Sequence, residues 1–231
     1  MFDFLLNILY PKRCLFCGSF GFYLCHKCNN LIHTNKIFIC PVCDRPSING
    51  TVHPRCQTRY SLDGLFSFWE YEGPVRKIIH KIKYDPFLFA AVNEIIHKNL
   101  NNPDNLHFVQ FLQIKNPVLI PVPLHKNRFR YRGYNHAAVI AKAFADKWRL
   151  KIIENLLIRI KETRPQVELK GKERRNNVKD AFSLNLSLSP PIPENIIMVD
   201  DVWTTGSTLR TCAALLKRNG AHSIWALTLA R

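Results

Sequence analysis

The sequence has no apolar run of the roughly 20 residues that a helix needs to cross a bilayer. Its apolar start, Phe2–Tyr10, is short, carries Asp3, and lacks both a basic leading segment and a small-residue cleavage site, so we do not expect a secretion signal. Apolar residues make up 47% of the chain and charged residues 22%, a composition that excludes a disordered protein. These features predict a globular, cytoplasmic protein without a transmembrane segment.

Acidic residues are scarce. The 231 residues include 33 lysines and arginines but only 17 aspartates and glutamates, which gives a formal net charge of +16. An excess of this size favours polyanionic partners, such as nucleic acid, phosphorylated small molecules or an acidic membrane surface. It is equally compatible with a solvated positive face, so charge alone does not choose a function.

Cysteines are concentrated at one end of the chain. Seven of the eight lie between Cys14 and Cys56, and Cys212 stands alone. Disulfide bonds form in oxidising compartments, which this chain is not expected to reach, so the clustered thiols favour metal binding. Cys212 shares an expected helix face with leucines, a pattern typical of a buried core thiol.

The clustered cysteines form two groups of paired turns. The first group has two CxxC turns, which together complete a tetrahedral zinc site. The second has CPVC followed by HPRC, and its histidine makes a Cys3His site, which is sound zinc chemistry. His26 is a competing ligand, and a cross-braced pairing of the turns stays open. Because protein ligands fill both sites, the zinc ions are expected to be structural. The predicted ligands are Cys14, Cys17, Cys25, Cys28, Cys40, Cys43, His53 and Cys56.

Beyond the cysteines, expected strands alternate with expected helices, a pattern typical of a mostly parallel α/β sheet. We expect a cysteine-rich zinc-binding module over residues 1–60 and an α/β domain over residues 61–231. Strands are expected at Asp63–Gly73, Pro117–Leu124, Lys151–Ile160, Asn195–Val199 and Ser223–Leu229. Helices are expected at Pro74–Tyr84, Pro86–Leu100, Asn135–Trp148 and Thr208–Asn219, and a loop at Ser183–Pro193.

The segment Ile196–Leu209 carries the clearest chemistry. An apolar strand ends in Asp200 and Asp201, and a TTGST turn leads into a helix. Backbone N–H groups at such a turn and helix start can hold a phosphate, and Gly206 permits close approach of the backbone. Carboxylates at a strand's carboxyl end suit ribose hydroxyls or a phosphate-bound Mg²⁺ ion. The pattern predicts a site for a phosphorylated sugar. Trp203 either stacks on a base there or covers the loop.

This segment resembles the motif that binds phosphoribosyl pyrophosphate (PRPP) in type I phosphoribosyltransferases. Nearly the whole chain is also similar to the ComF competence proteins, the GntX-like branch of that family. The resemblance departs from the family pattern at His53, Tyr134 and His136. It implies a type I phosphoribosyltransferase-like fold, a mostly parallel sheet flanked by helices, with a small N-terminal zinc-binding module. Besides the cysteine turns and the PRPP motif, it is carried by Tyr71–Asp85, Pro121–Ala137, Thr163–Leu169 and Glu173–Phe182.

The resemblance also implies roles for single residues. Asp200 and Asp201 would be the catalytic acidic pair at the ribose of Mg²⁺-bound PRPP. The 5-phosphate would be held by Thr204, Thr205, Gly206, Ser207 and Thr208. The stretch His125–Gly133 would be the pyrophosphate loop, binding through Lys126, Arg128, Arg132 and Gly133. A flexible loop that closes over PRPP would contribute Arg164, Gln166, Arg174 and Asn177.

Two functions compete. As a ComF-like competence protein, the chain would bind single-stranded DNA during natural transformation, using basic clusters interleaved with aromatics. The resemblance then implies a DNA-uptake helicase or recombination mediator as partner, and peripheral association with the inner membrane. Alternatively, the chain is an active phosphoribosyltransferase that transfers ribose-5-phosphate from PRPP to a nitrogen acceptor. A third hypothesis, compatible with the first, makes PRPP an effector that changes DNA affinity.

Overall fold

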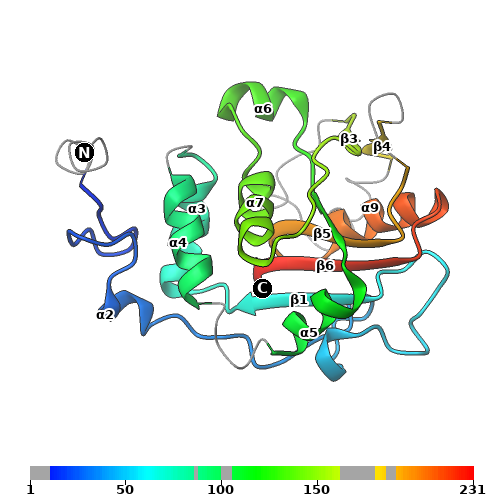
Figure 1. Cartoon of the computed structure of the whole chain (residues 1–231), viewed down its shortest axis with the longest axis horizontal. Helices are drawn as coiled ribbons and strands as arrows, with labels where there is room; N and C mark the ends of the chain where they lie inside the picture. Colours follow the sequence, from blue (N-terminus) through cyan, green and yellow to red (C-terminus); the bar gives the residue numbers. More distant parts are fainter. Residues whose placement is uncertain (1–10, 86–87, 100–105, 162–179, 186–190) are drawn as a thin grey trace.

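The computed structural model describes residues 11–85, 88–99, 106–161, 180–185 and 191–231. Its centre is a four-stranded sheet in the order β1-β6-β5-β2, with every neighbouring pair parallel (Figure 1). The strands are almost continuously apolar and buried, as expected for a parallel sheet covered on both faces. Their bounds are β1 Gly64–Trp69, β2 Val118–Pro121, β5 Asn195–Val202 and β6 Ser223–Ala230. A separate antiparallel pair joins β3 Leu157–Arg159 to β4 Phe182–Leu184.

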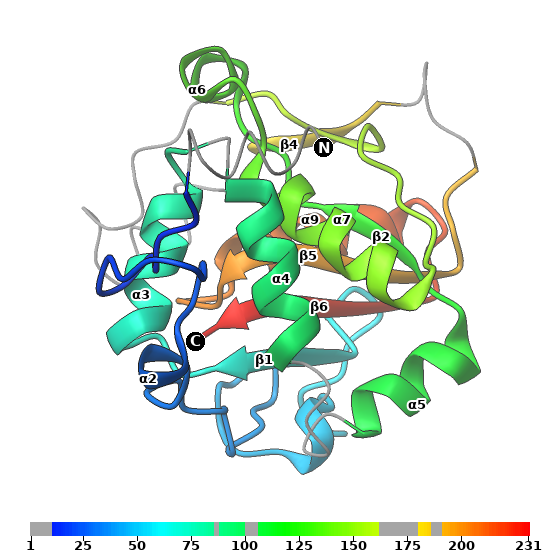
Figure 2. The ribbon, with the colours of Figure 1, turned by 60° about the vertical axis from the view of Figure 1, so that its left-hand side comes forward.

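Helices cover both faces of this sheet, and Figure 2 shows α4 and α7 in front of it with α9 behind. One core packs sheet residues such as Val199 and Leu227 against α3, α4 and α7. The other packs Met198 and Ala226 against Leu209, Cys212 and Leu216 of α9. The mixed α/β class, with a parallel sheet flanked by helices, is therefore confirmed. The helix bounds are α2 His26–Asn29, α3 Gly73–Ile82, α4 Phe89–Asn99, α5 Leu106–Lys115, α6 Lys126–Arg132, α7 His136–Trp148 and α9 Ser207–Arg218.

Three expectations about secondary structure need correction. The strand expected over Lys151–Ile160 shortens to β3, with only an isolated bridge from Ile152 to Leu119. The loop expected from Ser183 overlaps β4, because Ser183 pairs with Ile158. The basic stretch expected to be a pyrophosphate loop is a helix, α6, which buries none of its residues. A helix without a buried face shows no apolar stripe in its sequence, so periodicity could not indicate it.

The cysteine-rich segment runs along the β1 edge of the sheet. Thr34 bridges Trp69 and Thr51 bridges Gly64, both in the antiparallel sense. Gly64 is required there, since a Cβ atom would lie 2.1 Å from the ring of Trp225. The domain boundary between residues 60 and 61 stays a prediction. In the part of the chain that the structure describes, no helix has the length and apolarity to cross a membrane.

Candidate functional site

A pocket of about 280 Å³ opens at the carboxyl ends of β2 and β5. Parallel α/β sheets bind their ligands at this edge, where helices begin and loops diverge. We call it the central pocket. Its walls consist of Tyr71, Lys83, Tyr84, Val122, Pro123, Leu124, Arg128, Arg132, His136, Arg159, Asp200, Asp201, Val202, Thr204 and Thr208.

The turn between β5 and α9 forms the floor beside this pocket. Gly206 precedes α9 in the left-handed conformation, with φ of 64°, and the backbone N–H of Ser207, the first helical residue, donates to Oγ1 of Thr205 at 3.4 Å. Of the five residues predicted to hold a phosphate, Thr204 and Thr208 line the pocket. The other three form the turn itself, where the hydroxyls of Thr205 and Ser207 lie 2.8 Å apart. The local geometry is that of an anion-binding helix start.

The side chain of Trp203 packs against this turn. Its side chain is only 4% exposed, and a Cβ atom at position 206 would lie 2.2 Å from its ring. Its indole N–H donates to Oδ1 of Asp44, 3.1 Å away. Of the two alternatives for Trp203, the structure therefore supports a cover for the loop and not a stacking platform for a base.

The two aspartates at the end of β5 differ in environment. Asp201 is 7% exposed, and its Oδ2 lies 2.6 Å from Nζ of Lys83 and 3.8 Å from Nε2 of His136. Burial disfavours its charge, but the imidazole and the ammonium outweigh burial and hold the pKa of Asp201 below its usual value. Burial and the charge of Asp201 raise the pKa of Asp200 to about 8. At neutral pH, Asp201 is thus ionised while Asp200 is largely protonated.

Cations dominate the pocket. Arg128 and Arg132, one turn apart on α6, line it together with Lys83 and Arg159. Burial lowers the pKa of His136 to about 4, so this imidazole is neutral near pH 7. Among the described wall residues, these four cations thus stand beside two carboxyl groups, of which only that of Asp201 is ionised near pH 7. This balance favours an anionic ligand.

A direct cation site at the acidic pair is disfavoured by the same balance. His136, Asp200 and Asp201 do bring three ligand atoms within 4.8 Å of one another. Lys83, however, already supplies a positive charge 2.6 Å from the Asp201 carboxylate.

The residues predicted for pyrophosphate divide between two sides of α6. Arg128 and Arg132 line the central pocket, whereas Lys126 lines a second pocket on the opposite side of the helix. Gly133 ends α6 with φ of 78° and lies in neither wall. The four residues predicted for the closing loop, Arg164, Gln166, Arg174 and Asn177, lie outside the described residues.

Several wall residues were not predicted as site residues. Lys83 and Tyr71 belong to the Tyr71–Asp85 segment that carries the resemblance to the ComF family, but the resemblance assigned no role to either residue. His136 appeared only as a departure from the family pattern. In the structure its Nδ1 lies 3.4 Å from Nη1 of Arg132, and its Nε2 faces Asp201. The imidazole therefore links the basic helix to the acidic pair.

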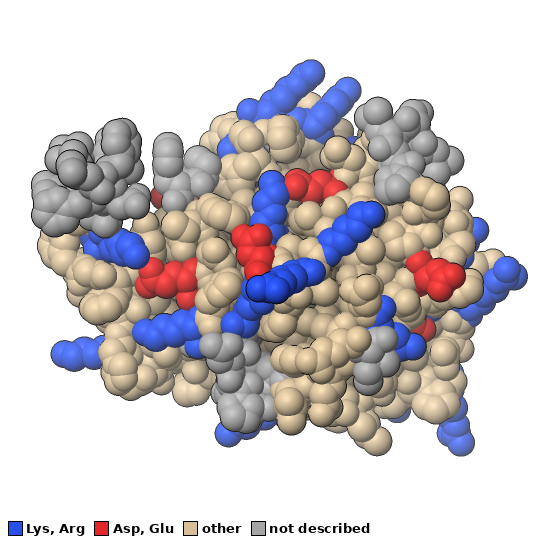
Figure 3. Space-filling model, in the orientation of Figure 1, with Lys and Arg blue, Asp and Glu red and all other residues tan. Residues whose placement is uncertain are grey.

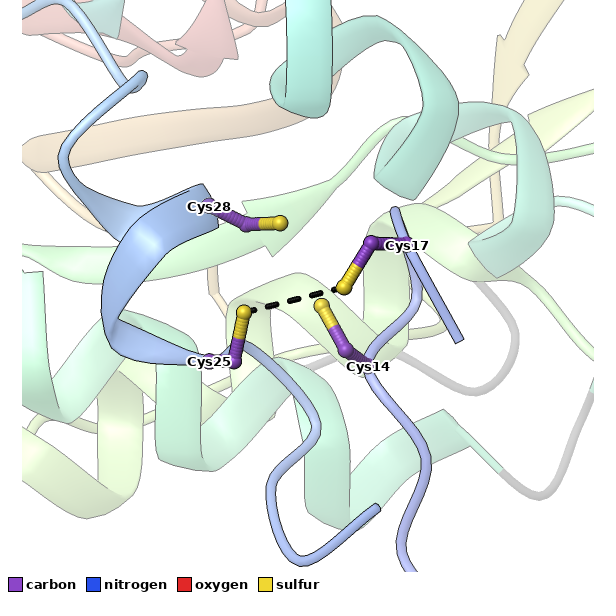
Figure 4. Close-up of side chains that lie close together, drawn as sticks. All are labelled: Cys14, Cys17, Cys25 and Cys28. Carbon is purple, nitrogen blue, oxygen red and sulfur yellow. Dashed lines mark hydrogen bonds between the residues drawn. The ribbon is translucent and has the colours of Figure 1, made fainter. Parts of the chain in front are cut away.

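The first cysteine group converges on one point (Figure 4). The four sulfur atoms of Cys14, Cys17, Cys25 and Cys28 all lie within 4.8 Å of one another. A tetrahedral zinc with metal–sulfur distances of about 2.3 Å places neighbouring sulfurs about 3.8 Å apart. The sulfurs of Cys17 and Cys25 are 3.7 Å apart, so this donor set fits zinc.

The second group contains the histidine. Ligand atoms of Cys40, Cys43, His53 and Cys56 again lie within 4.8 Å of one another. Nδ1 of His53 faces the Cys43 sulfur at 3.4 Å, while its Nε2 lies 2.9 Å from the Pro46 carbonyl oxygen, a bond that orients the ring. Each cluster thus uses two consecutive turns, without cross-bracing, and His26 joins neither.

Comparison with known proteins agrees with this organisation. Residues 5–57 match the family model described as "Double zinc ribbon domain". The chain is 28% identical to "Competence protein F" of Haemophilus influenzae, over 92% of this chain and 99% of that protein. This chain is a ComF homologue. It is also 27% identical to "DNA utilization protein YhgH" of Escherichia coli K12, over 96% of this chain and 97% of that protein. "Competence protein ComFC" of Bacillus subtilis is 28% identical, over 90% and 84%.

The double zinc ribbon of this ComF homologue corresponds to the two ligand clusters. Each ribbon holds one cluster of four side chains, and all four positions around a zinc ion are then occupied by protein. Structural sites have this closed arrangement, whereas catalytic zinc sites keep an open position. The expectation of a zinc-bearing N-terminal module in a ComF-type chain is confirmed.

Proposed function

We propose that this ComF homologue acts in DNA uptake during natural transformation, where it binds single-stranded DNA, and that its central pocket binds Mg-PRPP. The role in DNA uptake is supported by relatives named for competence and for DNA utilization. The observation that carries the ligand is the central pocket, whose described wall brings four cations beside the turn at Gly206. A pocket of this charge at a helix start is chemically suited to phosphate groups.

PRPP fits the order of groups along the pocket. Its 5-phosphate would lie on the Thr204–Thr208 turn and its ribose beside Asp200. Its pyrophosphate would face Arg128 and Arg132, whose guanidinium groups suit phosphate oxygens. Mg²⁺ would arrive on the pyrophosphate and neutralise part of its charge, while Asp201 stays paired with Lys83.

We assign DNA binding to the surface formed by α6, next to the central pocket. Lys and Arg side chains project from the end of the molecule where α6 lies, and others are spread over the rest of this face (Figure 3). On α6 itself, Tyr131 is 84% exposed and Phe129 is 49% exposed. Aromatic rings beside cations stack on unpaired bases and hold the backbone. We place this interaction at the cytoplasmic side of the inner membrane, with a DNA-uptake helicase or recombination mediator as the protein partner.

The PRPP proposal is tested by removing one hydroxyl from the pocket. Thr208→Val keeps the shape of the side chain but removes a hydrogen bond to a charged phosphate, so PRPP affinity should fall about tenfold or more. Thr211→Val is the matched control, one turn later on α9, and should bind PRPP as the wild type does. Isothermal titration calorimetry with Mg-PRPP measures both. Equal affinity in all three proteins would contradict the proposed site.

The DNA proposal is tested by salt dependence. Contacts between cations and phosphates release counterions, so the affinity for a single-stranded oligonucleotide should fall by about two orders of magnitude or more between about 50 mM and about 200 mM salt. Fluorescence anisotropy measures this, with a duplex of the same sequence as control. Absence of binding at the lower salt concentration would remove DNA from the proposal and leave PRPP.

A second candidate function is phosphoribosyl transfer. It is favoured by one observation, the position of the Asp200 carboxyl group in the pocket wall where the ribose would lie. An acidic group there can support positive charge at the sugar when ionised, and the arginines can stabilise departing pyrophosphate. Incubation with isotope-labelled PRPP and each common nucleobase tests this function. Failure to form a nucleotide with any of them would reject nucleobase salvage.

A further inference from the structure

Helix α6 separates the central pocket from a second pocket of about 380 Å³, which we call the outer pocket. The two are neighbours, since Pro123, Leu124 and Arg159 contribute to both walls. The outer pocket is lined by these three residues together with Lys126, Phe129, Arg130, Asn135, Glu154, Asn155, Leu157 and Ile158.

The two sides of α6 offer different chemistry. Arg128 and Arg132 face the central pocket, where charge dominates. On the other side, the ring of Phe129 and the apolar side chains of Leu157 and Ile158 form a surface with Lys126 and Arg130 beside it. The first environment suits phosphate groups, and the second suits a flat base with a nearby anionic backbone. Neighbouring pockets of these two kinds match two adjacent nucleotides of a single strand.

PRPP and the first nucleotide of a phosphorylated strand share one fragment, a furanose ring with a phosphate on its 5-oxygen. We propose that the central pocket also receives the 5′-phosphorylated end of single-stranded DNA, with the base of the next nucleotide in the outer pocket. This inference rests on the proposed function, because it gives the Thr204–Thr208 turn the same phosphate as in PRPP. It makes PRPP and a DNA end competitors for one site.

The charge of the central pocket supports a strand end over an internal position. A terminal phosphate monoester carries about −1.5 to −2 charge near neutral pH, against −1 for an internal phosphodiester. The four cations of the described wall, Lys83, Arg128, Arg132 and Arg159, therefore attract the end more strongly. The acidic pair does not oppose this, since Asp200 is largely protonated and Asp201 is paired with Lys83.

The test compares two oligonucleotides of one sequence that differ only in a 5′-phosphate or a 5′-hydroxyl, each labelled at the 3′ end. Anisotropy at physiological salt should show about tenfold tighter binding of the phosphorylated strand, the effect expected of a charge-assisted contact. Unlabelled PRPP should displace the phosphorylated strand and have little effect on the other. Thr208→Val should abolish the preference, because Thr208 belongs to the turn that holds the 5′-phosphate. Arg130→Ala, on the other side of α6, should weaken both strands alike.

Each outcome of this test either supports or overturns the inference. Equal binding of the two strands, or failure of PRPP to displace the phosphorylated one, overturns this inference and leaves DNA and PRPP binding intact. No binding of either strand overturns the DNA part of the proposed function as well. If Thr208→Val lowers the melting temperature, Thr204→Val replaces it, since Thr204 lines the same pocket from the same turn. A preference that survives Thr208→Val in a folded protein would also overturn the inference.

Discussion

Arg210 of α9 binds the carboxylate of Asp44 in the zinc module, with Nη2 lying 3.1 Å from Oδ1 and 3.0 Å from Oδ2. The same guanidinium donates from Nε to the Pro41 carbonyl oxygen at 2.6 Å and from Nη1 to the Thr205 carbonyl oxygen at 2.8 Å. Asp44 also accepts the indole N–H of Trp203. The second zinc ribbon is thereby tied to the turn that we propose binds phosphate.

This tie predicts that Arg210→Met reduces PRPP affinity although Arg210 does not line the central pocket. Loss of the bonds to Pro41 and Thr205 frees the turn, so the affinity should fall about three- to tenfold and the stability by about 1–2 kcal/mol. Calorimetry and urea unfolding measure the two effects. The control is Arg218→Met, at the other end of α9. If both variants bind PRPP alike, the tie contributes to stability alone.

Loss of zinc from the second cluster should weaken PRPP binding more than loss of zinc from the first cluster. Cys56→Ser removes a ligand of the cluster that includes the Cys40–Cys43 turn next to Asp44, so the protein should hold one zinc ion in place of two and bind PRPP more weakly. Cys25→Ser, in the first cluster, should lose one zinc with a smaller effect on PRPP. Metal content by mass spectrometry and calorimetry on the same samples measure both effects.

A conservative exchange supplies the control for these zinc variants. His53→Cys restores a four-cysteine set, so it should retain two zinc ions and the PRPP affinity of the wild type. A single zinc ion in the wild-type protein would contradict the two-site assignment. An equal loss of PRPP affinity in Cys56→Ser and Cys25→Ser would contradict the special role of the second ribbon.

The turn at Gly206 predicts a strong effect of a single methyl group. A Cβ atom there would lie 2.2 Å from the Trp203 ring, and φ of 64° already disfavours a side chain, so Gly206→Ala should destabilise the protein by about 2–4 kcal/mol. Gly220→Ala tests the backbone alone, because φ is 110° but no atom lies within 4 Å of its Cβ position. Urea unfolding should show a smaller loss for Gly220→Ala. Equal losses would show that the Trp203 contact relaxes freely.

The parts of the site that the sequence predicts are local in the chain. The strand, the acidic pair and the glycine turn follow one another within Ile196–Leu209, so their spacing alone indicates a helix start that holds an anion. The zinc ligands are equally local, since each CxxC turn brings its own two donors together. Local patterns of this kind do not depend on how distant helices pack.

The other residues of the pocket wall come together only through the packing of elements that lie far apart in the sequence. Lys83 directly follows α3, which carries several other cations, and only the packing of that helix beside the end of β5 brings the Lys83 ammonium to Asp201. Likewise, α6 has no buried residue, so its sequence shows no helical stripe, and its bounds come from the His125 cap and Gly133. Helix α5 was not predicted for the opposite reason. Its sequence LHFVQFLQIK is apolar around most of the helix, so no single apolar stripe marks one face.

The unequal aspartates predict opposite effects of two neighbouring substitutions. The pKa of Asp200 is raised from 3.8 to about 8, so the unfolded chain loses this proton first and wild-type stability falls as pH rises between those values. Asp200→Asn stays neutral, so its advantage over the wild type should grow by roughly 3–4 kcal/mol between about pH 5 and about pH 8. Thermal unfolding across this pH range measures the difference in stability between the two proteins. The pH dependence of the zinc ribbons is common to both proteins and cancels in this difference.

Asp201→Asn should act in the opposite direction. The pKa of Asp201 is held low by His136 and Lys83 against burial, so the ionised form stabilises the fold at every pH above its ordinary value. Removing that charge leaves the Lys83 ammonium, 27% exposed, without its partner at 2.6 Å, which should cost about 2–4 kcal/mol near pH 7. If both substitutions destabilise the protein equally at all pH values, the two carboxyl groups do not differ in charge. The central pocket would then carry a second negative charge beside its four described cations, which would weaken the attraction for both proposed ligands.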